Sequence, residues 1–118
     1  MAATKTSRTL YASASLAAAR SVNATELSLS TAYGALVAVK LTNGATAPTT
    51  APTVKFYVGE STGTKRLFYT ASGDIVNSSV NDIVCEIPPS AMFVNVTITW
   101  GATTGGTVEA YGQELTTI

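Results

Sequence analysis

The chain has 118 residues, of which 46% are hydrophobic and only 12% are charged. Seven basic residues balance seven acidic residues, so the formal net charge is zero. This composition excludes an intrinsically disordered chain, which combines low hydrophobicity with high net charge, and no basic stripe marks a nucleic-acid partner. One domain of ordinary size is expected, and its charge-poor surface favours association with other proteins.

The first twenty residues are expected to form an N-terminal arm, which could include a first strand. Residues 1–8 are polar and lack periodicity, and such a terminus is ordered only where a partner orders it. Leu10, Leu16 and two of the alanines between them occupy every second position, which favours a strand over a helix. The segment is too poor in large apolar residues for a signal peptide. No apolar run approaches the roughly 20 residues that cross a bilayer, so no membrane partner is expected.

The remainder, residues 21–118, is expected to form a single β-sandwich domain. Short apolar stretches with a period of two are separated by turns of Gly, Pro, Asn and Ser. The expected strands are residues 10–16, 26–30, 36–42, 53–60, 65–70, 82–87, 93–100 and 107–115. About eight strands with this spacing indicate an all-β fold, namely an antiparallel β-sandwich of jelly-roll or immunoglobulin-like type.

Alternation along the strands also predicts which side chains are in the core. Val94, Val96 and Ile98 share one face with Trp100, so this tryptophan is expected in the core or at its edge. Cys85 is the single cysteine, which excludes an intramolecular disulfide. It lies on the apolar face of its strand, and we expect it to be a small buried hydrophobic residue.

No catalytic set is recognisable, and the chain is not expected to be an enzyme. It contains no His, which removes most acid–base, nucleophilic and transition-metal schemes. Glu109 and Glu114 are the nearest pair of carboxylates for a glycosidase, but their odd spacing on one strand makes them face opposite ways. The glycine-rich residues 101–106 lack the lysine and following helix of a phosphate loop. No cofactor is expected.

Two binding alternatives remain open. Asp74 and Asp82 flank a polar loop in which an oxygen cage for calcium is conceivable, but the dense spacing of a calcium loop is missing, so no metal is expected. Four aromatic side chains could stack on a sugar: Tyr57, Tyr69, Tyr111 and Trp100. Core packing explains Trp100 more simply, and single exposed aromatic residues are ordinary on protein surfaces.

A family resemblance is carried by three stretches, residues 30–48, 86–96 and 107–111. They are similar to small structural proteins of tailed bacteriophages, which include capsid decoration (cement) proteins and modules of head or tail fibres. The resemblance covers the last three-quarters of the chain and rests on strands and turns, so no functional residue can be carried over. It implies a β-sandwich on the capsid exterior of a virion, a homotrimer that bridges and stabilises subunits of the major capsid protein. A fibre or carbohydrate-binding module for attachment is the alternative.

Contacts with partners are expected in the less regular parts: the N-terminal arm, the loop at residues 45–52, the turn at residues 101–106 and the C-terminal tail. The expected contact residues are Lys5, Arg8, Pro48, Pro52, Tyr57 and Ile118. The edges of an open sheet also offer unpaired N–H and C=O groups. Strands rich in Thr and Val with little charge do little to protect such edges, so association with copies of the chain or with a partner is expected there.

Overall fold

The computed structural model describes residues 4–16, 21–45, 50–61, 64–100 and 106–117. This part of the chain consists of nine strands and their connections, with no helix. The strands are β1 (Thr4–Leu16), β2 (Ser21–Asn23), β3 (Leu27–Ser28), β4 (Ala35–Thr42), β5 (Thr53–Ser61), β6 (Thr64–Ser72), β7 (Val80–Ile87), β8 (Phe93–Thr99) and β9 (Gly106–Thr117). Within the described ranges, therefore, no helix could cross a membrane.

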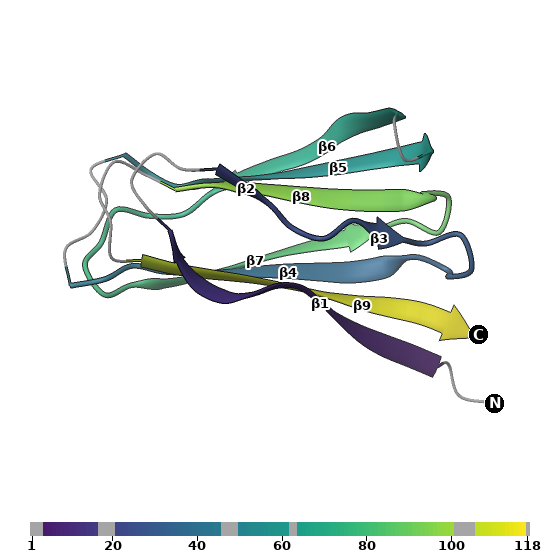
Figure 1. The fold of residues 1–118 in the computed structure, drawn as a ribbon, viewed down its shortest axis with the longest axis horizontal. Helices are drawn as coiled ribbons and strands as arrows, with labels where there is room; N and C mark the ends of the chain where they lie inside the picture. The colour runs from purple at the N-terminus through teal and green to yellow at the C-terminus, as the bar shows by residue number, and fades with distance from the viewer. Residues whose placement is uncertain (1–3, 17–20, 46–49, 62–63, 101–105, 118) are drawn as a thin grey trace.

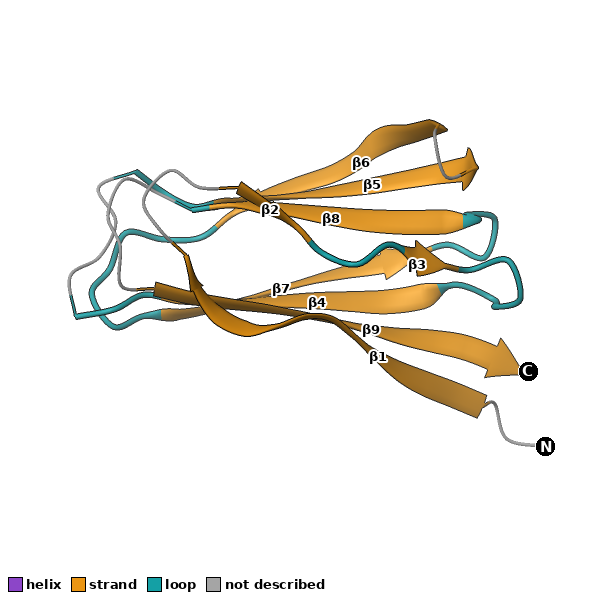
Figure 2. Cartoon of the chain, viewed as in Figure 1, coloured by secondary structure: helices purple, strands orange, loops and turns teal. Residues whose placement is uncertain are grey.

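The strands form two antiparallel sheets that face each other as the two layers of a sandwich (Figures 1 and 2). Sheet A has the order β1-β9-β4-β7, and sheet B has the order β2-β8-β5-β6. The short strand β3 also pairs with β8, so β2 and β3 lie one after the other along the same edge of that strand. The predicted antiparallel all-β sandwich is therefore confirmed, with nine strands where about eight were expected.

Residues 4–16, the described part of the segment predicted as an arm, form the edge strand β1. This strand pairs with β9 from Thr4, opposite Thr117, to Leu16, opposite Gly106, with three shifts of register on the way. Most of its described side chains are exposed, but Leu10 is buried in the core. Backbone pairing with β9, more than an apolar face, is what holds β1 in the sheet.

The core lies between the two sheets and is built from alternate residues of the inner strands. Side chains with no exposed surface come from β4, β5, β8 and β9: Val37, Val39, Leu41, Val54, Phe56, Val96, Ile98 and Ala110. Trp100 is 2% exposed and Cys85 is 7% exposed, so both are buried as predicted. Alternation therefore identified the buried face correctly, because each sheet has one face in the core and one face in water.

Both described chain ends lie at the same end of the sandwich, because Thr4 pairs with Thr117 (Figure 1). The β3–β4 and β7–β8 connections reach this end as well. Segments far apart in the sequence thus meet there.

Candidate functional site

The two carboxylates considered for catalysis face opposite sides of sheet A, as predicted. Glu114 points inward and is only 6% exposed, and it pairs with Arg8 at 3.3 Å. Glu109 points outward and accepts a hydrogen bond of 2.6 Å from the Tyr111 hydroxyl. That hydrogen bond raises the pKa of Tyr111. Among the described residues, no group of three or more His, Cys, Asp or Glu side chains is placed to hold a metal ion.

Asp74, one of the two acids considered for calcium, uses its carboxylate to fold its own loop. Oδ2 accepts a hydrogen bond of 2.7 Å from the Ser79 hydroxyl, and Oδ1 accepts one of 3.1 Å from the Val76 N–H. Nδ2 of the buried Asn43 donates to the same Oδ1 at 2.9 Å and to the Val76 carbonyl at 2.8 Å. Asp82 instead lies exposed within β7. Asp74 therefore ties the connection after β6 to the end of β4.

This network makes part of the stability depend on pH. The hydrogen bonds from Ser79 and then Val76 hold the pKa of Asp74 below its ordinary value. A carboxylate with a lowered pKa in the folded state stabilises the fold above its ordinary pKa, and that contribution is lost as the pH falls through the lowered value. We expect Asp74→Asn to lower the urea midpoint near neutral pH and the gap from wild type to narrow below about pH 4. Urea unfolding curves across this range, with Asp82→Asn as control, test the expectation; a gap that does not change with pH would contradict it.

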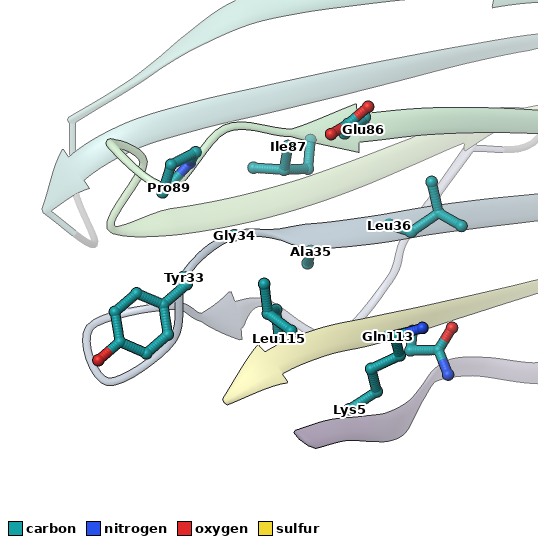
Figure 3. Close-up of a pocket in the computed structure, with 10 residues that line it drawn as sticks. All are labelled: Lys5, Tyr33, Gly34, Ala35, Leu36, Glu86, Ile87, Pro89, Gln113 and Leu115. Carbon is teal, nitrogen blue, oxygen red and sulfur yellow. The ribbon is translucent and has the colours of Figure 1, made fainter. Parts of the chain in front are cut away.

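One end of sheet A carries an open hollow of about 290 Å³, which we call the terminal groove (Figure 3). It is lined by Tyr33, Gly34, Ala35 and Leu36 around the start of β4, by Glu86, Ile87 and Pro89 around the end of β7, and by Gln113, Leu115 and Lys5 from β9 and β1. Enclosed sites for small ligands usually measure about 300–1,000 Å³. A hollow at the lower limit of that range that is open to solvent fits protruding side chains of a protein partner better than it would enclose a small molecule.

Backbone hydrogen bonds hold the base of the terminal groove in place, and both apolar and charged side chains surround it. The Leu115 N–H donates to the Gly34 carbonyl at 3.0 Å, and the Tyr33 N–H donates to the Leu115 carbonyl at 2.7 Å. Tyr33 and Leu36 are 49% and 45% exposed, so two large apolar surfaces face the solvent there. The exposed Lys5 and Glu86 add one charge of each sign. Apolar anchors with single opposite charges suit protein recognition.

Exposed apolar side chains also lie on the two edge strands β6 and β7, and we call this set of residues the edge surface. It comprises Leu67, Phe68 and Tyr69 of β6 with Val80 and Val84 of β7, each between 45% and 54% exposed. Strands β6 and β7 are the last strands of sheets B and A. Exposed apolar residues on strands with an unpaired edge are candidates for contact with a partner.

Lys5 and Arg8, two of the predicted contact residues, are exposed on β1. Lys5 lines the terminal groove. Arg8 lies farther along the strand, where it pairs with Glu114 at 3.3 Å.

Pro52 and Tyr57, two further predicted contact residues, do not line the groove. Pro52 is fully buried at the start of β5, and Tyr57 is half-buried within that strand. Pro48 and Ile118 lie outside the described residues. The exposed Leu67–Tyr69 run was not among the predicted contacts, although three consecutive large apolar residues in a strand must place at least one on each face.

Comparisons with known proteins support the fold. No protein-family model matches the chain, and no curated protein sequence matches it. A solved structure from Bacillus endospore appendages, described as disulfide-linked pili, is 19% identical with a TM-score of 0.57, over 100% of this chain and 93% of that chain. The SPBc2 prophage-derived protein YomS is 17% identical with a TM-score of 0.52, over 97% and 95%.

A third structure is longer than this chain. The PBSX exported protein XepA is 8% identical with a TM-score of 0.64, over 92% of this chain and 36% of that chain. The described sandwich thus spans about a third of XepA. At these identities the similarity establishes a shared β-sandwich fold with proteins that include phage-derived ones.

Proposed function

We propose that the chain is a structural protein of a bacteriophage virion, and that its specific role is capsid decoration. The observation that carries the proposal is the apolar surface: eleven large hydrophobic side chains among the described residues are between 39% and 58% exposed. Only 12% of the residues are charged, so little repulsion opposes association. The similarity of the fold to the phage-derived YomS and XepA supports this role.

We also infer a jelly-roll connectivity, which is common among capsid proteins. When β2 and β3 are counted as one interrupted strand, the pairs are nested: β1 with β9, β2 and β3 with β8, β4 with β7, and β5 with β6. Strand pairs nested in this way arise when one long antiparallel hairpin is folded over into two sheets. Consecutive strands therefore cross between the layers, and among the described strands only β5 and β6 form a hairpin between neighbours.

In the proposed role, a homotrimer sits on the capsid exterior and bridges subunits of the major capsid protein. Its action is mechanical, because surface buried across a joint between subunits resists the separation of those subunits. A contact of about 1,600 Å² in total is enough for stable docking. We assign the terminal groove to the capsid, since a three-fold axis parallel to the strands would point all three grooves the same way.

The groove assignment predicts that Leu36→Asp weakens binding to empty capsids by roughly tenfold or more, because it places a charge on an apolar anchor. Leu36 is 45% exposed, so the variant should fold normally. Ile75→Asp is the matched control, since Ile75 is 57% exposed in the connection between β6 and β7, outside the groove. Co-sedimentation with capsids measures the effect. Failure of the wild-type protein to bind capsids would refute the decoration role, and normal binding by Leu36→Asp would refute the groove assignment alone.

A fibre or carbohydrate-binding module is the second candidate, favoured by the exposure of Tyr69 at 48% and Tyr111 at 44%. These tyrosines lie on different sheets, and Trp100 is buried, so they do not form one stacking platform. A glycan array distinguishes the candidates: clear hits that disappear in Tyr69→Ala or Tyr111→Ala would favour attachment over decoration.

A further inference from the structure

We propose that copies of this chain associate through the β6–β7 side of the sandwich, with β6 of one copy against β7 of the next. The inference rests on the homotrimer of the proposed function and adds the surface that builds it. Capsid binding is not needed for it.

The first argument is that both strands have an unpaired edge. β6 ends sheet B and β7 ends sheet A, so within the described chain each has a neighbour on one side only. The unpaired side of such a strand presents free N–H and C=O groups to any strand that can align with it. Leu67 and Tyr69 of β6 and Val84 of β7 are 54%, 48% and 54% exposed, so apolar side chains accompany these backbone groups.

The second argument is charge complementarity, which identifies the occupant as another copy. β6 contains Lys65 and Arg66 and no acid, whereas β7 contains Asp82 and Glu86 and no base. Lys65 is already paired with Glu26 of its own chain, so a contact of β6 with β7 of a second copy sets Arg66 against an acidic strand. A contact of β6 with β6, or of β7 with β7, offers no opposite charges. Arg66 and Glu86 take part in none of the ion pairs found within the described residues.

The third argument is that these charges lie at the same height along the strands. Arg66 and Phe68 line a hollow of about 300 Å³ together with Pro88 and Ala91, which directly follow β7. Arg66 therefore lies at the same end of the sandwich as the end of β7 that carries Glu86. Rotation about an axis parallel to the strands keeps every residue at its height, so Arg66 of one copy meets Glu86 of the next. β6 and β7 run in opposite directions (Figure 1), so the two strands meet antiparallel.

Charge reversal with rescue tests the proposal on the full chain. Sedimentation velocity should give wild-type particles of about three times the 12.1 kDa mass of one chain. Arg66→Glu alone and Glu86→Arg alone should each raise the dissociation constant by roughly tenfold or more, and the double variant should restore assembly. Lys55→Glu is the control, because Lys55 is exposed on β5, which has neighbours on both sides. Far-UV circular dichroism shows that each variant is folded. Val84→Asp is a second test of the same interface, because it places a charge at an exposed apolar position of β7.

The outcomes separate the two proposals. A wild-type protein that is monomeric at every concentration overturns both the homotrimer and this interface. A wild-type oligomer that tolerates each single reversal, or a double variant that stays dissociated, overturns the β6–β7 interface and leaves the homotrimer intact. Rescue by the double variant, with loss of assembly in Val84→Asp, supports the interface whether or not capsids are bound.

Discussion

Replacing Phe56 with alanine is expected to lower the free energy of unfolding by about 3–5 kcal/mol. Phe56 is the largest of the fully buried side chains, and it lies in β5 opposite Val96 of β8. Its ring centroid is 5.9 Å from that of Tyr69. The alanine variant would leave a cavity beside β5, a strand held by pairing with both β6 and β8, so collapse cannot fill it. Since small domains are stable by about 5–15 kcal/mol, urea unfolding followed by fluorescence should show a large loss.

Phe68→Ala is the matched control, since the same residue type is removed from a position that is 45% exposed on the edge strand β6. Its effect should be within about 0.5 kcal/mol, as is usual at surface positions. Both variants must be compared at a concentration where each sediments as a monomer, because self-association adds to apparent stability. If Phe56→Ala cost no more than Phe68→Ala, the described packing between the sheets would be wrong.

The strands that were predicted well are those with one buried face and one exposed face. In β4, Val37, Val39 and Leu41 alternate with Leu36 and Lys40, and the structure buries the first set and exposes the second. The sequence of such a strand then alternates with a period of two, because each position must suit either the core or water. The same reasoning correctly placed the side chains of β8 and the single cysteine.

The edge strands were harder to predict because their partners, not their side chains, define them. Thr4–Leu16 is polar on most positions, and its role as β1 depends on pairing with β9, about a hundred residues away in the chain. β2 was not expected, and the strand expected at residues 26–30 is shortened to β3; both are defined by their pairing with β8. Local alternation predicted strands at residues 10–16 and 26–30, but it does not contain the pairing that extends β1 to Thr4 or adds β2.

The candidate surfaces also depend on register between distant segments. Lys5, Leu36, Glu86 and Leu115 meet in the terminal groove only because β1, β4, β7 and β9 are neighbours in sheet A. Partner contacts were expected in loops, at the chain ends and along open sheet edges, but the residues named for them include none of the edge surface. Pro52 illustrates the limit: a proline before a strand indicates a loop, but its burial follows from packing that no local pattern contains.

Gly34→Ala should lower the free energy of unfolding by about 2–4 kcal/mol. Gly34 has a φ of 100°, a region that residues with a Cβ rarely adopt. A Cβ there would lie 2.6 Å from the Ile87 carbonyl oxygen and 3.2 Å from the Pro89 nitrogen, both of which are backbone atoms with little freedom to move. Gly112→Ala is the control, because Gly112 has no positive φ and the Cβ there would lie 3.0 Å from a side-chain atom of Leu27, not from the backbone.

The two destabilising changes should also separate stability from binding. The Gly34 carbonyl accepts the Leu115 N–H at 3.0 Å, so movement of residue 34 disturbs the floor of the terminal groove directly. Phe56 lies in sheet B and does not line the groove, so its replacement changes no groove residue. When the capsid binding of only the folded fraction of each variant is compared, Gly34→Ala should therefore bind more weakly than wild type, and Phe56→Ala should bind as wild type does. Equal binding by both variants would mean that the capsid contacts a different surface, even if both stability effects are as large as expected.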